Sequence, residues 1–580
     1  MNLFADIHTL VTRSLWELQE EGVLPDGLDF TSVTVEPPRD TLHGDMATNA
    51  AMVLAKPAKM KPHDIAVPLA ARLLTDERVD TADVAGPGFL NLRLTTAVWA
   101  AVVPAALQAG VDFGRSRMGH GKRINIEYVS ANPTGPLHVG HTRGAVFGDT
   151  LANLLAFAGF DVTREYYIND GGAQVDVLAR SVYLRYLEAH GQDVAFEDGT
   201  YPGDYLIPVG QALKEKAGDA YVGAPEADWL TDVREFSTGA MMDLIREDLK
   251  ALGVEMDLFY SEKSLYNTGQ IEAALEALEQ KGLICEGVPE PPKSRTPEYW
   301  EPRKQTLFRS SEHGDDVDRP IRKSDGSWTY FAPDIAYHYD KIERGFDALI
   351  DVFGTDHGGY VKRMKAAVSA LSDGQVSLDV KLIQLVRLLK NGKPFKMSKR
   401  AGIFVTMRDI VDQAGADATR FHMLTRKNDA PLDFDFALVL DQSKENPVFY
   451  VQYAHARICS VVRKASEAGL DVNDRNLQNC DLAHLSDMAE IALIRKVAEW
   501  PRLLELAVHH NEPHRIAFYL YDLAGEYHVL HNRGKSRETL RFWQPEDAAA
   551  SSARIAMIRA VAVVLSAGLA ILGINPMEEM

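Results

Sequence analysis

Apolar side chains recur with two different periods in the middle of the chain, which predicts alternating strands and helices. Residues 122–129 alternate between apolar and polar with a period of two, as a strand does. A loop with two prolines at 130–136 ends this strand, and apolar residues then follow at helical spacing from Phe147 until Gly159. Residues 161–168 predict another strand, so this stretch is a βαβ unit of a parallel sheet.

The same alternation returns after a looser region. The stretch at about 190–300 is rich in acidic, Gly and Pro residues and predicts an insertion between two halves of the α/β region. A predicted strand, helix and strand follow at 347–353, 360–371 and 380–389. Thr406 and Asp409 then have the spacing of a capping box, which predicts the start of a helix.

The two ends of the chain differ from this middle. Residues 1–113 mix helical with short extended patterns, including a predicted strand at 88–94 and a predicted helix at 97–109. After about residue 431 the strand patterns fade, and helical spacing persists to the end. We therefore expect a multidomain α/β protein with a Rossmann-like parallel-sheet domain at 114–430 that carries the insertion, an α+β N-terminal domain at 1–113 and an all-α C-terminal domain at 431–580.

Composition narrows the class of protein. The apolar share of 46% and the charged share of 25% are those of a globular chain, which excludes a collagen, a coiled coil or a wholly disordered chain. We expect no membrane helix, because no apolar run reaches about 18 residues, and the charged N-terminus is not a signal peptide. The three cysteines are scattered singly, so we expect inert thiols in a reducing cytoplasm. A net charge of −20 does not predict a nucleic-acid binder, although a local basic stripe would suffice for one.

The first chemical motif is His138-Val139-Gly140-His141, at the predicted start of the helix that follows the Pro/Gly loop. A helix N-terminus binds phosphate through unpaired N–H groups and the helix dipole. Two histidines three apart share a face and can donate to the same phosphate chain, and Gly140 leaves room for a nucleotide ring. The alternatives are a pair of metal ligands, which lacks the adjacent Glu of zinc proteases, or two surface histidines.

The second motif is Lys396-Met397-Ser398-Lys399, in a loop between two glycines. Two lysines three apart in a mobile loop suit the transient stabilisation of a pyrophosphate leaving group. Taken alone, the same residues fit a solvated basic loop. The chain has neither a P-loop nor a strand-anchored dinucleotide fingerprint that would explain phosphate binding instead.

Together these two motifs, in this order and separated by an insertion, resemble the signature motifs of class I aminoacyl-tRNA synthetases. Residues 127–141 closely resemble the form found in arginyl-tRNA synthetases. Further stretches similar to that family lie at Leu42–Asn49, Gly86–Phe89, Gly354–Gly358 and Asn446–Arg457. The resemblance therefore extends over nearly the whole chain.

The resemblance implies that ATP activates the arginine carboxylate as an adenylate, and that arginine then passes to the terminal adenosine of its tRNA. It implies catalytic roles for His138, His141, Lys396 and Lys399, and it adds Gly140, Met397 and Ser398 to the ATP site. The substrate carboxylate attacks, so catalysis rests on orientation and electrostatics, with Mg²⁺ on the phosphates and no tightly bound metal ligated by the protein. Many members replace the second motif by a lysine at the position of Gly135, whereas this chain keeps the motif intact.

Arginine recognition follows from the chemistry of its side chain. A guanidinium presents five donors in a planar fork, which suits carboxylates that accept in a bidentate manner. The resemblance places Glu127 and Asp334 in that pocket, with Tyr330 lining it and Asn132 near the amino-acid backbone. The alternatives are a solvated strand face for Glu127 and a helix N-cap for Asp334. Asp356 and His357 are expected to line the same crevice, in roles that the sequence does not assign.

For tRNA, the resemblance implies an anticodon-binding domain at 431–580 and a domain for the tRNA elbow at 1–113. The basic residues Arg533, Lys535 and Arg537 predict a phosphate-binding stripe, and Tyr450 either stacks on an anticodon base or belongs to the core. We expect a cytoplasmic monomer. The rival interpretations are a small-molecule nucleotidyltransferase, which does not need two flanking domains, and a degenerate RNA-binding protein, which does not need an intact site.

Overall fold

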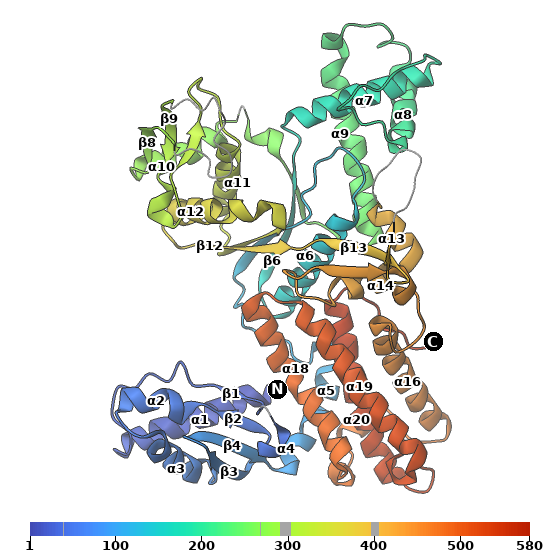
Figure 1. The fold of residues 1–580 in the computed structure, drawn as a ribbon. Coiled ribbons are helices and arrows are strands. Elements are labelled where there is room, and N and C mark those ends of the chain that lie inside the picture. The colour runs from blue at the N-terminus through green and yellow to red at the C-terminus, as the bar shows by residue number, and fades with distance from the viewer. Residues whose placement is uncertain (39, 267, 290–302, 396–404) are drawn as a thin grey trace.

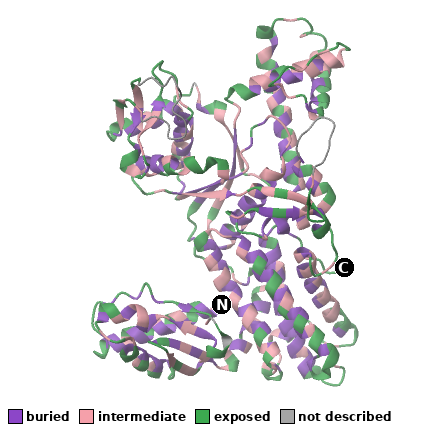
Figure 2. Cartoon of the chain, in the orientation of Figure 1, coloured by how far each residue is buried: buried purple, intermediate pink, exposed green. Residues whose placement is uncertain are grey.

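The computed structural model describes residues 1–38, 40–266, 268–289, 303–395 and 405–580. Figure 1 shows a central sheet with two lobes above it, a helical bundle below it and a small N-terminal domain beside the bundle. Figure 2 shows buried residues concentrated in the bundle and along the central sheet. The multidomain α/β architecture expected from the sequence is thus present.

The N-terminal domain packs its helices on a four-stranded antiparallel sheet with the order β1-β2-β4-β3. Its elements are α1 (Leu3–Glu20), β1 (Val35–Glu36), β2 (Met46–Thr48), α2 (Ala50–Ala58), α3 (Pro62–Leu73), β3 (Val79–Ala85) and β4 (Phe89–Leu94). The strand predicted at 88–94 is confirmed as β4. The helix predicted at 97–109 is two helices, α4 (Thr96–Ala100) and α5 (Val102–Ala109).

The central sheet is parallel, with the strand order β12-β11-β5-β6-β7. Its strands are β5 (Arg123–Glu127), β6 (Asp161–Ile168), β7 (Leu258–Ser261), β11 (Ala348–Gly354) and β12 (Ser377–Ile383). The helices that follow strands in its βα units are α6 (Val139–Phe157), α7 (Ala173–Ala189) and α12 (Val361–Leu371), and α11 (Phe331–Glu343) precedes β11. The predicted βαβ unit is confirmed, with β6 matching its predicted bounds.

Two predictions around the second half of the sheet are wrong. The stretch 380–389 is not one strand, because the chain leaves β12 at Gln384 and forms β13 (Val386–Lys390) in another sheet. The Gln384 N–H donates to the Asn428 carbonyl, and its own carbonyl accepts from Arg143, so this residue is held out of either ladder. Strand structure also continues past residue 431, since β13 pairs with β14 (Lys393–Pro394) and β15 (Leu432–Asp435).

The predicted insertion is also not a single unit. Its segment β7 is the edge strand of the central sheet, because it pairs with β6. One lobe is a helical arm made of α7, α8 (Ile207–Ala217) and α9 (Glu226–Ala251), with its own apolar core. The other lobe holds α10 (Gln270–Gln280) and a small sheet of β8 (Ile284–Gly287), β9 (Gln305–Phe308) and β10 (Arg319–Arg322). Local composition distinguished this region from the rest of the α/β domain. It did not indicate which segment of the region pairs with the central sheet.

Helices make up the C-terminal part of the chain. They are α13 (Met407–Ala414), α14 (Ala416–Met423), α15 (Phe436–Val439), α16 (Pro447–Glu467), α17 (Asp474–Gln478), α18 (Met488–His510), α19 (His514–Ser536) and α20 (Ala548–Ile571). The predicted capping box is confirmed, with Thr406 as the N-cap of α13. Among the described residues, α20 is long and apolar enough to cross a membrane, which corrects the expectation that no segment has this length and composition. In the folded protein, 78% of its apolar window is buried.

Candidate active site

The described residues that we predicted for ATP and arginine binding lie on or near the carboxyl ends of β5, β6 and β11. Ligands of open parallel α/β sheets bind at this edge, because the loops that leave the strands there form a crevice. Val129 and Ser130 follow β5 and both adopt positive φ angles, of 72° and 39°. A β-branched residue rarely adopts such a conformation, and strained backbone of this kind clusters at functional sites.

The two histidines of the first motif cap α6. His138 is the N-cap, and its Nδ1 accepts the N–H of Gly140 at 3.0 Å, while Nδ1 of His141 accepts the N–H of His138 at 3.2 Å. A neutral imidazole that accepts at Nδ1 carries its proton at Nε2. Both rings are therefore fixed in the tautomer that offers an Nε2–H donor, and they stack with centroids 3.8 Å apart.

Both histidines are held neutral by burial. Burial lowers the pKa of His141 to about 3, with a smaller contribution from the neighbouring His138, and burial also lowers the pKa of His138. The pair thus offers hydrogen-bond donors rather than cations at neutral pH. A Cβ at Gly140 would lie 2.8 Å from the His138 ring, so the glycine allows the ring to pack closely on the helix start.

The second motif lies outside the described residues. The roles assigned to its residues therefore stay predictions, and these residues are Lys396, Met397, Ser398 and Lys399. The chain that follows is bonded to the first motif. Val139 donates its N–H to the Val405 carbonyl at 3.2 Å, and Met407 donates to the Leu137 carbonyl at 2.7 Å. The structure therefore ties Val405 and Met407, which lie six and eight positions after Lys399, to the start of α6.

Three carboxylates lie side by side across three neighbouring strands. Glu127 on β5 is the direct register partner of Asp351 on β11 and of Glu165 on β6. All three are buried, with exposures of 4%, 0% and 0%. Like charges so close together require counter-charges, because each has lost its hydration.

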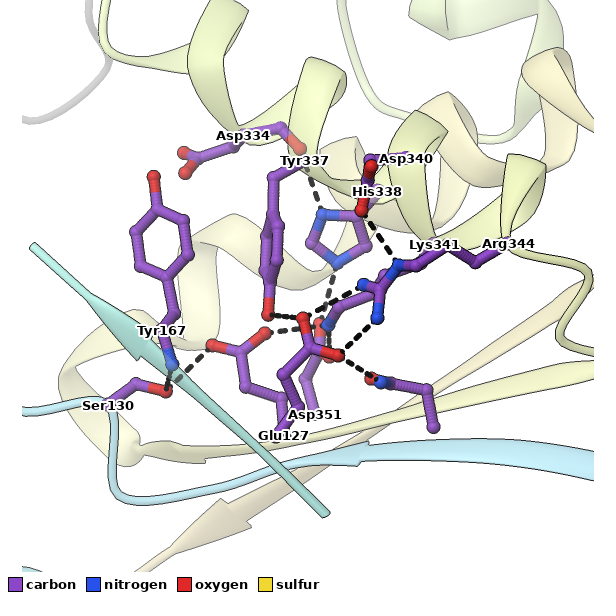
Figure 3. Close-up of polar contacts among 12 residues, drawn as sticks. Glu127, Ser130, Tyr167, Asp334, Tyr337, His338, Asp340, Lys341, Arg344 and Asp351 are labelled. Atoms are coloured by element: carbon purple, nitrogen blue, oxygen red, sulfur yellow. Dashed lines mark hydrogen bonds and ion pairs between the residues drawn. The ribbon is translucent and has the colours of Figure 1, made fainter. Parts of the chain in front are cut away.

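Helix α11 supplies those counter-charges, as Figure 3 shows. Lys341 Nζ lies 2.7 Å from Glu127 Oε2 and 3.3 Å from Asp351 Oδ1. Arg344 binds both oxygens of Glu165, at 2.8 and 2.9 Å. His338 adds an Nε2 contact to Asp351 at 2.9 Å. The predicted pocket residue Glu127 is therefore part of a buried ion network and not a solvated strand face.

Asp334 lies on the same helix, on the pocket side of this network. The pKa of its carboxyl is raised to about 6, chiefly by burial and also by the nearby carboxylates of Glu262 and Glu127, while the hydrogen bond from the Tyr360 hydroxyl lowers it. The Tyr167 hydroxyl points to the same side in Figure 3 and has no hydrogen-bond partner among the described residues. A carboxylate whose burial penalises its charge and an unpaired buried hydroxyl fit a site that takes a cationic, hydrogen-bonding group.

The other predicted pocket residues lie nearer to solvent. Asn132 Nδ2 donates to Gln174 Oε1 at 2.8 Å, and Tyr330 at the start of α11 is 92% exposed. Asp356 and His357 form a pair at 3.5 Å in a 3₁₀ turn after β11, with both side chains exposed. All four side chains are therefore exposed to solvent, and their roles stay predictions.

Sequence reasoning missed Lys341, Tyr167 and Tyr360. A signal for Lys341 was present, because Asp334, His338 and Lys341 follow at positions i, i+4 and i+7 and share one face of a helix. Nothing in the local sequence marks Tyr167 or Tyr360, which reach the pocket from β6 and from the turn before α12.

The residues predicted to contact tRNA lie on the helical bundle. Arg533, Lys535 and Arg537 are exposed at the end of α19, and Arg537 pairs with Asp487 at 2.9 Å. Beside them lies a cavity of about 430 Å³, lined by Val461, Lys464, His531, Gly534, Lys535, Leu540, Arg541, Phe542 and Trp543. Tyr450 lies apart from this cavity and packs on the rings of Tyr521 and His528, at centroid distances of 5.1 and 4.5 Å.

Within the described parts of the chain, no three His, Cys, Asp or Glu side chains gather in a way that could hold a metal ion.

Comparisons with known proteins match the chain in three parts. The matching family models are described as the arginyl tRNA synthetase N terminal domain at residues 5–94, the class I (R) tRNA synthetase catalytic domain at 102–433 and the DALR anticodon binding domain at 451–580. The catalytic model covers more than half of the chain.

Curated relatives match the full length. An arginine–tRNA ligase of Ruegeria pomeroyi is 71% identical over 580 residues and one of Roseobacter denitrificans is 68% identical, each with 100% of both chains covered. The solved arginyl-tRNA synthetase of Thermus thermophilus superposes with a TM-score of 0.72 at 22% identity, covering 100% of both chains, and this likeness shows the shared fold.

Proposed function

The chain belongs to the arginyl-tRNA synthetase family, and from this membership we infer that it is an arginine–tRNA ligase. The structural observation that carries this function is the juxtaposition, at one edge of a parallel sheet, of a histidine-capped helix start with a pocket of buried carboxylates. The first suits the phosphates of ATP, and the second suits a guanidinium.

We propose the following roles in activation. A carboxylate oxygen of arginine attacks the α-phosphorus of ATP, a new O–P bond forms, and the bond to the bridging oxygen breaks to release pyrophosphate. His138, Gly140 and His141 hold the phosphates through N–H donors, and Lys396 and Lys399, with Met397 and Ser398 between them, stabilise the leaving pyrophosphate. ATP enters with Mg²⁺ on its phosphates, and no tightly bound metal ligated by the protein is required.

For the amino acid, we propose that Glu127 and Asp334 accept the guanidinium donors, that Tyr330 covers the pocket and that Asn132 meets the amino-acid backbone. The raised pKa of Asp334 supports this proposal, because a bound guanidinium would compensate the charge that its surroundings disfavour. No protein nucleophile is needed in the second step, in which a ribose hydroxyl of the tRNA attacks the activated carbonyl and AMP leaves.

For tRNA, we propose that 1–113 meets the elbow and that the helical domain at 431–580 meets the anticodon, with Arg533, Lys535 and Arg537 on the phosphates and Tyr450 on a base. The exposed cations at the end of α19 support the phosphate contacts. We further propose that the protein acts as a cytoplasmic monomer without a membrane partner; its scattered cysteines and the buried face of α20 support this.

Arginine-dependent exchange of pyrophosphate into ATP tests the function directly. We expect exchange with arginine and with no other amino acid, measured with and without tRNA that accepts arginine. Exchange that requires the tRNA would show that RNA docking completes the site. No exchange with any amino acid in either condition would contradict the proposal and favour a degenerate RNA-binding protein, whereas amino-acid-independent exchange would favour a small-molecule nucleotidyltransferase.

A further inference from the structure

Lys341 is a buried cation that the proposed chemistry does not use. Its side chain is 0% exposed, and its Nζ lies between Glu127 on β5 and Asp351 on β11. The Tyr337 ring covers it at 4.3 Å, so solvent does not reach the ammonium. Burial lowers its pKa, but the carboxylates of Asp351, Glu127 and Glu165 outweigh burial and raise the pKa above the usual range, so the group stays charged.

The three carboxylates of the row do not depend on Lys341 to the same extent. Glu165 accepts from Arg344, from the Tyr337 hydroxyl at 2.8 Å and from Asn125 at 2.6 Å. Asp351 has His338 as a second partner. Glu127 is the nearer partner of Lys341, at 2.7 Å against 3.3 Å for Asp351, and its one other donor among the described contacts is the Ser130 hydroxyl at 3.0 Å.

These two donors fix the Glu127 carboxylate in one orientation. Ser130 binds Oε1 and Lys341 binds Oε2, so neither oxygen is free to rotate away. A carboxylate has about four lone-pair sites, and one on each oxygen therefore stays available for a planar fork of donors. Ser130 is itself held by the backbone N–H of Tyr167, which donates to its hydroxyl at 3.1 Å.

We propose that Lys341 is a positioning residue for substrate recognition, which holds the Glu127 carboxylate in the orientation that accepts the arginine guanidinium. This inference rests on the proposed arginine pocket. Lys341 itself does not touch the substrate. Because its action passes through Glu127, its loss should weaken arginine binding and leave ATP binding unchanged.

Arg344 provides a matched control. It directly follows α11, three residues after Lys341, and pairs with a carboxylate of the same row, but that carboxylate is Glu165 and not Glu127. Lys341→Met and Arg344→Met each remove one cation and two carboxylate contacts, to Glu127 and Asp351 in the first and to Glu165 and Asp340 in the second. Both should lower the melting temperature, because an uncompensated buried charge is costly. Only Lys341→Met should alter the pocket.

The experiment compares full-length variants in arginine-dependent pyrophosphate exchange with tRNA present. For Lys341→Met we expect the KM for arginine to rise about 10- to 100-fold, the range for a lost hydrogen bond to a charged group. The KM for ATP should stay within about twofold, and the KM for arginine in Arg344→Met within about threefold. An equal rise in both Met variants would overturn the proposal, since the effect would then be a general loss of structure.

Two further variants keep the outcome decisive. If Lys341→Met does not fold, Lys341→Arg and Arg344→Lys are measured in place of the two Met variants. Both substitutions keep the charge and change only the geometry of the donors. The KM for arginine should rise at least about threefold in Lys341→Arg and stay unchanged in Arg344→Lys. An unchanged KM in Lys341→Arg would overturn the proposal in that case. Glu127→Gln separates the two hypotheses: if it leaves the KM for arginine unchanged, the proposed pocket fails, and if it raises this KM while Lys341→Met does not, only the positioning role fails.

Discussion

His138 and His141 cap the same helix with the same ring nitrogen. Each Nδ1 accepts a backbone N–H at the start of α6, and the two rings stack with centroids 3.8 Å apart. The hydrogen bonds that start the helix thereby also fix both tautomers, and two Nε2–H donors stand side by side at the positive end of the helix dipole. One arrangement serves both the helix start and the proposed phosphate site.

His141→Asn is expected to separate these two roles. The asparagine amide can keep an acceptor near the position of Nδ1, while the Nε2–H donor is lost. We expect an unchanged melting temperature and an arginine-dependent exchange rate about 100- to 1000-fold lower. His141→Gln is the complementary variant, because its amide reaches toward Nε2; it should lose about 1 kcal/mol of capping stability and keep more of the exchange rate. The opposite ranking would contradict the assignment.

Asp334→Asn should weaken arginine binding and stabilise the protein. The pKa of this carboxyl is raised from 3.8 to about 6, so keeping it ionised at pH 7 costs about 3 kcal/mol. The Asp334 carboxyl binds its proton more tightly in the folded state than in the unfolded state. The free-energy cost of ionising it in the folded protein is therefore absent below about pH 4 and complete above about pH 6. We expect the KM for arginine to rise about 100-fold, since one charge-assisted contact is lost.

The stability effect of Asp334→Asn has its own measurement. The melting temperature of the variant should exceed that of the wild type at pH 7.5, and the difference should shrink at pH 5. A difference independent of pH would show that the carboxyl titrates normally. A KM for arginine equal to that of the wild type would remove Asp334 from the pocket.

Lys399→Ala tests the second motif. Because the motif is intact and Gly135 offers no substitute charge, we expect the exchange rate to fall about 100- to 1000-fold. Lys393→Ala is the control, since this lysine is exposed on β14 in the same part of the chain. Activity retained in Lys399→Ala, or lost equally in the control, would contradict the proposed stabilisation of pyrophosphate.

Lys535→Ala should act on tRNA alone. We expect the KM for tRNA in aminoacylation to rise and the slope of log affinity against log salt to fall by about one, with the KM values for ATP and arginine unchanged. Arg537→Ala should have the smaller effect, because part of its charge is neutralised by Asp487. Binding of labelled tRNA at several salt concentrations measures both. Equal salt slopes in wild type and Lys535→Ala would remove this residue from the phosphate stripe.

Local periodicity was sufficient to predict a helix or strand wherever the side chains of that element alone determine its structure. The strand at 161–168, the helix that starts at the first motif and the capping box at Thr406 all follow from residues within one or two turns of each other. Short sequence motifs were equally sufficient to identify the family, because the residues proposed to bind its substrates lie close together in the sequence.

Periodicity failed where pairing partners decide the structure. Residues 380–389 look like one strand, yet Gln384 is bonded to Asn428 and contacted by Arg143, which divides the stretch between two sheets. The segment Leu258–Ser261 lies in a region of insertion-like composition, yet it completes the edge of the central sheet because β6 offers it a partner.

The sequence by itself determined the family and the βαβ frame, and its motifs supplied Glu127, Asp334, His138 and His141 as the residues proposed for the site. Only the tertiary structure decided that Glu127 stands between two other carboxylates and shares a buried lysine with one of them. Glu127 and Lys341 are 214 positions apart. A buried charge is stabilised only by groups that surround it in space, and strand register and helix packing, which no local pattern encodes, bring those groups together.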